Sequence, residues 1–313
     1  MWKSPRTGGV AVLAALVAVA PLAFPNAYFY DVAVNALFNA VVCVGLNLLI
    51  GYGGQISLGH AGFFALGAYG SAILTGKYGF PPLGAMLTSA AAVGGLAIIV
   101  GRPILKLKGH YLAMATLGIG IIIHIVLKTE SQWTGGPDGI GVDPFQIMGF
   151  ALPGEQAWYW LAAALLVLAV WMAQNLIDSP VGRALRAVHG SEVGAEVVGV
   201  DTTRYKVMVF VISAVLASLV GSLFAHKNGF ITPDVGGFFR SIELVTMVVL
   251  GGMASTFGAV IGAVILTLLP QVLAAVEEYE AMVLGAIMMG TMIFMPKGLL
   301  PSLRLLLAKG RGR

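Results

Sequence analysis

The chain contains a long succession of apolar stretches, and each is about as long as a helix must be to cross a lipid bilayer, roughly 20 residues. Charged residues, or glycine and proline, separate these stretches, as expected for membrane spans joined by short loops. We predict ten spans, at about 10–24, 32–50, 57–75, 83–100, 111–127, 157–177, 207–226, 241–254, 257–275 and 281–296. A shorter re-entrant hairpin is the alternative for the pair 241–254 and 257–275.

The composition supports a membrane protein. Hydrophobic residues make up 58% of the 313 residues and charged residues only 10%, whereas a soluble domain carries about 25% charged residues. A water-soluble fold of this length could not cover its surface with so few charges, so the apolar excess must face lipid. We therefore predict an all-α polytopic integral membrane protein, in which residues 1–313 form a single transmembrane domain with broken or re-entrant segments.

The distribution of positive charge predicts the topology. If the N-terminus is cytoplasmic and the spans alternate, fourteen of the 18 lysines and arginines fall on the inner side. These are Lys3, Arg6, Arg102, Lys106, Lys108, Arg183, Arg186, Arg204, Lys206, Lys297, Arg304, Lys309, Arg311 and Arg313, and the outer ones are Lys77, Lys128, Lys227 and Arg240. This asymmetry follows the positive-inside rule, and it places both termini in the cytoplasm.

Two loops are longer than the others. The outer loop, at about 128–156, contains the turn-forming run TGGPDG from Thr134. The inner loop, at about 178–206, is predicted to carry a helix from Arg183 to Val198, which ends at Gly199. Because a short helix between two spans needs a partner to be useful, we expect this cytoplasmic loop to contact another protein.

Enzyme and metal motifs are absent from the sequence. It has no GxxxxGK[ST] phosphate loop, no HExxH, no CxxC and no GxSxG elbow, and the five histidines do not fall at metal-ligand spacing. We therefore predict no catalytic residue, no metal site and no cofactor in this chain. Energy for any transport must come from an ion gradient or from another subunit.

Ion coupling usually requires charged groups inside the membrane, where they are costly. The only clear candidate is Glu243, which we place close to the outer end of its predicted span and interpret as an interfacial carboxylate. The membrane interior is otherwise predicted to hold neutral polar groups. This argues against proton or sodium coupling, although backbone carbonyls at broken helices can also hold sodium.

Two helix breaks are the strongest local indication of a transport pathway. The run GYGGQISLGHAGFF from Gly51 joins two predicted spans, and LGGMASTFG from Leu250 forms a weakly similar break on the same side. Such backbone must be packed in protein or line a wet cavity, because lipid cannot satisfy its polar groups. The candidate pathway residues are Gly53, Gly54, Gln55, Ser57, Gly59, His60, Gly251 and Gly252. The alternatives are tight turns with close helix packing, and a purely structural, hydrogen-bonded His60.

Six stretches then resemble a known family, in consistent order from about residue 30 to 300. They are GYGGQISLGHAGFFALGAYG from Gly51, KGHYLAMATLG from Lys108, TGGPDGI from Thr134, SPVGRALRAVHGSEVGAEVVGV from Ser179, FRSIELVTMVVLGGMASTFGAVIGA from Phe239 and FMPKGLLP from Phe294. These stretches are similar to the permeases of the branched-chain amino-acid ABC importers, in particular to the LivM type.

The resemblance implies partners that spacing alone does not. Members pair with a second homologous permease, two cytoplasmic ATPase subunits that bind the ATP, and an external substrate-binding protein. It also implies that residues 191–199 form the coupling motif that docks in an ATPase groove. The coupling candidates are Glu192, Gly194, Ala195, Glu196 and Gly199, and without the resemblance they would be interpreted as a solvated surface helix. His189 and Gly190 depart from the charged residues that members often carry there.

The favoured function is therefore a permease subunit that moves branched-chain or other hydrophobic amino acids across the bacterial inner membrane, with the lipid bilayer as its surroundings and no nucleic-acid partner. The resemblance leaves urea or short amides open as substrates. An ion-coupled secondary carrier is a second hypothesis, which uptake without any ATPase would support. A membrane enzyme acting on lipid is a third, but the polar cluster that it needs is not found.

Overall fold

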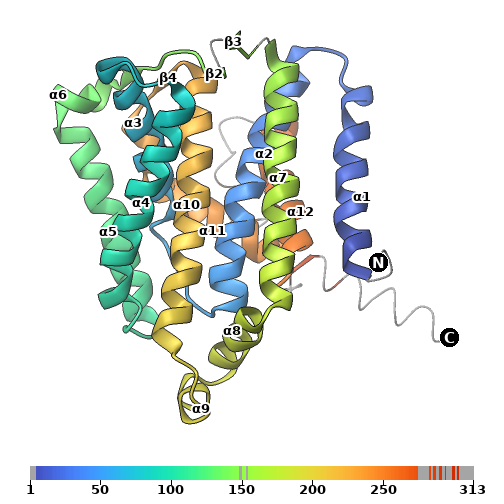
Figure 1. The fold of residues 1–313 in the computed structure, drawn as a ribbon. Coiled ribbons are helices and arrows are strands. Elements are labelled where there is room, and N and C mark those ends of the chain that lie inside the picture. Colours follow the sequence, from blue (N-terminus) through green and yellow to red (C-terminus); the bar gives the residue numbers. More distant parts are fainter. Residues whose placement is uncertain are drawn as a thin grey trace.

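The computed structural model describes residues 5–147, 150–152 and 154–273, and the single residues 282, 285, 286, 289, 290, 293, 298, 299 and 302. Most of these residues form helices that run side by side in one bundle (Figure 1). The helices are α1 (Pro5–Val19), α2 (Ala27–Asn47), α3 (His60–Tyr78), α4 (Pro82–Ile104), α5 (His110–Thr129), α6 (Ser131–Thr134), α7 (Gly154–Asp178), α8 (Pro180–Gly190), α9 (Glu192–Val197), α10 (Thr202–Asn228), α11 (Phe238–Gly251) and α12 (Thr256–Leu273).

Short turns and strands join the helices. The turns are η1 (Ala20–Ala23), the π-helical η2 (Leu48–Tyr52), η3 (Gly136–Asp138) and η4 (Pro233–Gly236), and the strands are β1 (Ile140–Gly141), β2 (Gln146–Ile147), β3 (Phe150–Ala151) and β4 (Phe230–Ile231). β1 pairs antiparallel with β4, and β2 with β3. These two-residue pairs cover the end of the bundle at which α3 and α10 end (Figure 1).

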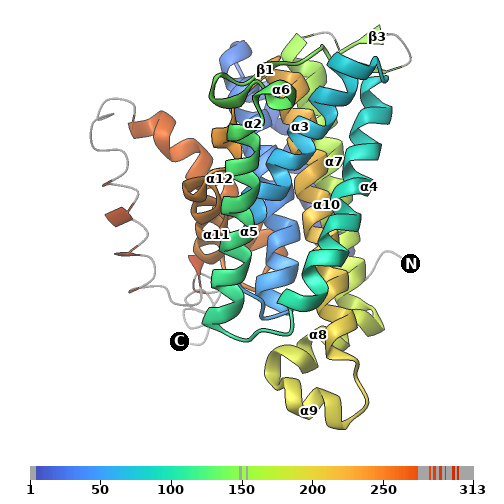
Figure 2. The same cartoon turned by 90° about the vertical axis from the view of Figure 1, so that its left-hand side faces the viewer.

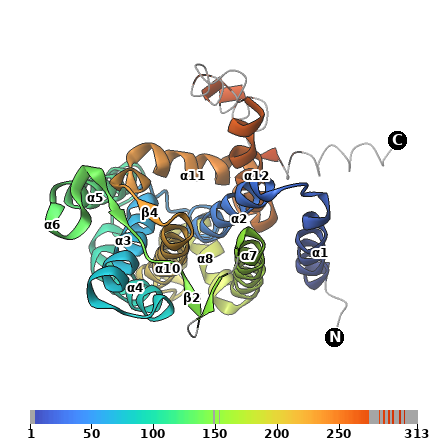
Figure 3. The ribbon, with the colours of Figure 1, turned by 90° about the horizontal axis from the view of Figure 1, so that it is seen from above.

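The core is built around α2. α10, with α3 and α4, lies on one side of α2, and α7 and α12 lie on the other (Figure 3). Every residue from 36 to 50 is buried, which is typical of a helix that is apolar all round and surrounded by other helices. Asn39 and Asn47 are the polar exceptions in this stretch, and both make hydrogen bonds to other elements.

Small residues bring α3 and α10 into backbone contact. A Cβ added at Gly221 would stand only 2.0 Å from the Phe64 carbonyl oxygen, and one at Gly67 only 2.2 Å from that of Ser218. This approach is the glycine-mediated packing expected between membrane helices. It fixes α3, the helix that follows the first break, against α10.

Each predicted span from 10–24 to 257–275 overlaps a helix, although residues 57–59 and 252–254 are not helical. Among the described residues, five helices are long and apolar enough to cross a membrane: Ala27–Tyr52, Pro82–Ile104, His110–Thr129, Gly154–Asp178 and Thr202–Asn228. Shorter apolar helices occupy Gly8–Ala23 and Thr256–Gln271. The chain is thus a mostly helical membrane protein. The predicted span 281–296 lies largely outside the described residues, and the count of ten stays a prediction.

Both predicted breaks are present: the first precedes α3, and the second follows α11. The Ala61 N–H in the first turn of α3 donates to the Ser241 hydroxyl of α11, 3.2 Å away. The His60 ring meets Ser213, which lies near the middle of α10. α3 and α11 therefore both begin at mid-depth, and α11 crosses the bundle obliquely, so that it is seen along its length in a view down the other helices (Figure 3).

The inner loop differs from the prediction of one helix from Arg183 to Val198, which is wrong. Two helices, α8 and α9, project from the end of the bundle where α1 begins (Figure 1), as a second view also shows for α8 and α9 (Figure 2). Ser191 divides them because its hydroxyl accepts a hydrogen bond from the Gly194 N–H, 3.1 Å away, and so starts a new helix. The predicted stop at Gly199 is confirmed, since its φ is +84°.

Candidate functional site

α9 is held to the bundle by its two acidic residues. Glu192 forms an ion pair with Lys206 of α10, and Lys108 Nζ lies 3.7 Å from the other Glu192 oxygen. Lys206 is only 1% exposed, so this charge depends on its partner. The Thr202 hydroxyl donates to Glu196 Oε1 at 2.9 Å. Both carboxylates predicted to contact an ATPase thus have partners within the chain.

Valines project from α9 and from the residue after it, and Glu196 is exposed beside them. Ala195 is buried against the bundle, whereas Val193, Val197 and Val198 are 64%, 81% and 74% exposed. Gly194 and Gly199 lie beside them on the surface. We did not single out these valines from the sequence, although the spacing of four residues between Val193 and Val197 already places that pair on one face of a helix.

A pocket of about 270 Å³ connects this loop to the first break. Three segments line it: Gly53, Gly54, Gln55 and Ile56 of the break, Leu107, Lys108, Gly109 and Leu112 at the start of α5, and Val188, His189, Gly190, Ser191, Glu192 and Lys206 of the inner loop and α10. Gly54 has a φ of +65°, and a Cβ there would stand 2.7 Å from His189 Nδ1. Three of the pathway candidates therefore share one pocket with the coupling candidate Glu192.

The remaining candidates of the first break are packed inside protein. His60 is 1% exposed, and its ring nitrogens lie 2.8 Å from the Ser57 hydroxyl and 2.7 Å from that of Ser213. A Cβ at Gly59 would stand 2.2 Å from the Thr116 carbonyl oxygen of α5. These hydrogen bonds favour the interpretation of His60 as a packing residue, and its place in a pathway stays a prediction.

The second break lies directly against the first. The Ala254 N–H donates to Asn47 Oδ1 at 3.0 Å, and the Tyr52 hydroxyl donates to the Ala254 carbonyl at 2.7 Å. Gly251 packs against α12, where a Cβ would stand 1.9 Å from the Gly258 carbonyl oxygen, and Gly252 has a φ of +116°. The prediction that both breaks lie on one side of the molecule is confirmed.

Glu243 does not lie near the outer end of a span, and Arg240 does not lie in an outer loop, so both predictions are wrong. Arg240 Nη1 is 2.6 Å from Glu243 Oε2, and Nη2 is 2.5 Å from Asn39 Oδ1. Asn39 stands at the midpoint of the span Ala27–Tyr52, and its amide donates to Thr267 of α12 at 2.9 Å. The chain already lies at mid-depth at η4, before α11 begins. The ion pair on α11 therefore lies at mid-depth too.

Other charged side chains meet at the opposite end from α9. Lys227, buried at the end of α10, pairs with Asp31 of α2 and lies 3.7 Å from Glu155 of α7. No group of three or more histidine, cysteine, aspartate or glutamate side chains suited to a metal ion occurs in the part of the chain that the structure describes.

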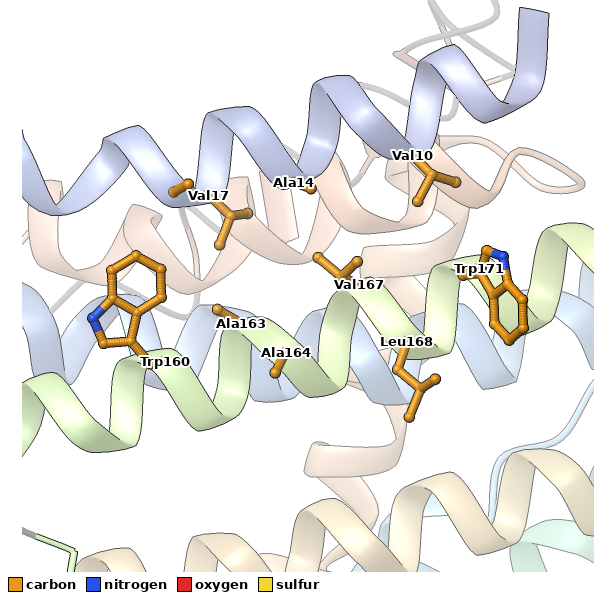
Figure 4. A pocket seen from close by; sticks show the side chains of 10 residues that line it. Val10, Ala14, Val17, Trp160, Ala163, Ala164, Val167, Leu168 and Trp171 are labelled. Carbon is orange, nitrogen blue, oxygen red and sulfur yellow. The ribbon is translucent and has the colours of Figure 1, made fainter. Parts of the chain in front are cut away.

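An apolar groove of about 500 Å³ runs between α1 and α7 (Figure 4). It is lined by Val10, Ala14, Val17, Ala18, Trp160, Ala163, Ala164, Val167, Leu168 and Trp171. The indole N–H groups are the only polar side-chain atoms among these residues, so the groove cannot orient a polar solute as the pocket beneath α9 can.

Residues 28–292 match the family model described as the branched-chain amino acid transport system / permease component. The chain belongs to this family. It is therefore a permease component of a transport system, and the membrane protein that the composition predicted.

Two relatives of this permease are the high-affinity branched-chain amino acid transport system permease proteins LivM of Salmonella typhimurium LT2 and Escherichia coli K12. They are 34% and 33% identical to it over 303 residues, which cover 88% of this chain and 70% of each relative. LivH of Escherichia coli K12 is 26% identical over 288 residues, covering 83% of this chain and 90% of LivH. The resemblance to the LivM type is confirmed. No solved structure matches the chain significantly.

Proposed function

We propose that this permease is the LivM-type subunit of an ATP-driven importer, which carries branched-chain amino acids across the inner membrane of a bacterium. The family match carries this proposal, because it spans residues 28–292 and because the two LivM relatives carry that substrate class in their names. The chain acts as a passage, and neither a catalytic residue nor a cofactor of its own is required.

The partners follow from the same argument. The similarity to LivH as well as to LivM supports a complex with a second, homologous permease. Two cytoplasmic ATPase subunits bind and hydrolyse ATP, and an external binding protein delivers the amino acid. With ten spans and both termini in the cytoplasm, α8 and α9 lie on the cytoplasmic side together with the start of α1.

The valines of α9 form the contact with the ATPase in this proposal. Val193, Val197 and Val198 make an apolar tip, and burying one valine side chain contributes roughly 1.5–3 kcal/mol. Glu192 and Glu196 have a different task, since they fasten α9 to α10 and so transmit its movement. A rigidly held apolar tip can follow the movements of the ATPase groove that binds it.

The pocket beneath α9 carries that movement to the pathway. Because His189 touches Gly54, a shift of α8 and α9 displaces the first break. Gly53, Gly54 and Gln55 then form part of the inner gate, while Ser57, Gly59 and His60 brace the point where α3 begins. Gly251 and Gly252 hold the second break against the first, so that both move together.

Reconstitution tests the proposed function. The chain, its homologous permease partner and two ATPase subunits are inserted in vesicles with leucine-loaded binding protein outside. We expect leucine uptake that requires ATP and that an excess of urea leaves unchanged. Uptake by this chain alone, driven by an ion gradient without any ATPase, would instead establish a secondary carrier.

Topology is tested separately by labelling. A cysteine at Val197, in a Cys43→Ala background, is expected to react with an impermeant maleimide only in inside-out vesicles. Reaction in right-side-out vesicles would place α9 outside the cell, where no ATPase could reach it.

A further inference from the structure

An ion pair stands at mid-depth on the oblique helix α11. Arg240 contacts Glu243 at 2.6 Å and Asn39 at 2.5 Å, and Asn39 is at the midpoint of the central span. Thr267 of α12 fixes the Asn39 amide at 2.9 Å. The guanidinium is thus positioned by two neighbouring helices as well as by its own.

The pair is not buried in the chain. The Arg240 side chain is 25% exposed and that of Glu243 is 40% exposed, and α11 lies at the margin of the bundle (Figure 3). Charged side chains at this depth are costly against lipid and are found facing protein or a water-filled cavity. The exposed face of α11 is therefore expected to face protein or water, and not the bilayer.

The unused bonding capacity of the pair matches one class of solute. A guanidinium has five N–H donors, and among the described residues Glu243 and Asn39 take two of them. A second carboxylate can bind the remaining donors, while the second Glu243 oxygen can accept from an ammonium group. A cation and an anion held side by side complement a zwitterion, in which an α-carboxylate and an α-ammonium group are separated by one carbon.

Apolar side chains adjoin the pair on the same helix. Phe239 is 84% exposed and Phe238 is 42% exposed, although both lie in the first turn of a helix at mid-depth. Ile242 follows one turn further along the partly exposed face. An amino acid held by its backbone charges would find aliphatic and aromatic surface for its side chain.

We propose that Arg240 and Glu243 bind the α-carboxylate and α-ammonium groups of the transported amino acid as it crosses between the two permeases. This inference rests on the proposed function and adds a binding site to it. The site recognises what hydrophobic amino acids share, and the apolar face of α11 accepts their side chains. A solute without the two charges, such as urea, would leave the ion pair unchanged and gain nothing from it.

The test uses the complete reconstituted transporter and measures leucine uptake and ATP hydrolysis in the same vesicles. Arg240→Gln and Glu243→Gln are expected to lower leucine uptake about 10- to 100-fold, the range for losing one hydrogen bond to a charged group. ATP hydrolysis stimulated by the binding protein is expected to continue, because α9 is untouched. Thr246→Val, on the same face one turn further, is the matched control and should transport normally, since among the described residues its hydroxyl bonds only to its own helix at Ile242.

The exchanged variant Arg240→Glu/Glu243→Arg separates binding from structure. It keeps an ion pair and is expected to restore thermal stability but not uptake, because Asn39 no longer meets a donor and the two charges are reversed. Uptake restored by the exchange, or normal uptake by both single variants, would overturn the site.

Loss of the second permease from the purified variants would also overturn the site, because the pair would then be a contact between subunits. Wild-type vesicles that hydrolyse no ATP and import no leucine would instead refute the proposed function, and this inference with it.

Discussion

His60, the first residue of α3, is joined to Ser213 of α10 by a hydrogen bond of 2.7 Å between Nε2 and the serine hydroxyl. Ser57 occupies the other ring nitrogen at 2.8 Å. The break in the chain therefore ends at a fixed point in the middle of the bundle. The residues before this point can move with the inner loop, while α3 beyond it stays packed on α10.

Removing the Ser213 hydroxyl should weaken this point. Ser213→Ala leaves a buried His60 nitrogen without a partner, which costs about 1–3 kcal/mol of unfolding free energy. We expect a lower unfolding midpoint for the purified complex in mild detergent. Ser218→Ala on the same helix is the control, because the Ser218 hydroxyl has no hydrogen-bond partner among the described residues, and its loss should not lower the midpoint. Equal midpoints for both variants would contradict a bracing role.

A methyl group at Gly54 should disturb the pocket beneath α9. Gly54→Ala forces a φ of +65° on a residue with a Cβ, at about 1–2 kcal/mol, and it also pushes against His189. We expect leucine uptake to fall and His189→Ala to restore part of it by relieving the contact. Gly76→Ala, in α3 where a Cβ meets nothing within 4 Å, should transport normally. No gain from the second substitution would mean that His189 does not press on the break.

A charge on the apolar tip of α9 should uncouple the transporter. Val197→Asp places a carboxylate where the proposed groove is apolar, and we expect ATP hydrolysis no longer to respond to loaded binding protein. Folding should be unaffected because Val197 is 81% exposed. Val197→Leu keeps the surface apolar and should keep the response. A normal response in the aspartate variant would remove the valines from the ATPase contact.

Breaking the ion pair behind α9 should destabilise the inner loop. Glu192→Gln leaves Lys206 buried without a counter-charge, and removing one partner of a fully buried pair costs about 3–5 kcal/mol, which is an upper bound here because Glu192 is partly exposed. We expect faster proteolysis within 178–206. Lys206→Met in the same chain should restore resistance, since no charge then remains buried. Resistance of the single variant would show that Lys206 reaches solvent without its partner.

Some of the site could be predicted from the sequence, and some could not. The glycine-rich breaks, the stop at Gly199 and the structural role of His60 follow from local signals, namely turn residues and a lone polar group in apolar surroundings. The division of the inner loop at Ser191 had a local signal too, because serine before an acidic residue starts a helix, but the helix formers on both sides masked it. The ion pair Arg240–Glu243 had none. Its depth depends on where η4 turns, which residues distant in sequence decide.

The order of apolar stretches and breaks by itself determined that the chain is a helical membrane protein and where its helices are interrupted. These properties depend on the transfer of side chains into lipid and on backbone preferences, and both act over a few neighbouring residues. Only the tertiary structure decided which face of α9 projects, what His60 touches and how deep Arg240 lies. These features depend on contacts between different helices. Lys206 of α10 forms an ion pair with Glu192 of α9, and Arg240 of α11 donates a hydrogen bond to Asn39 of α2.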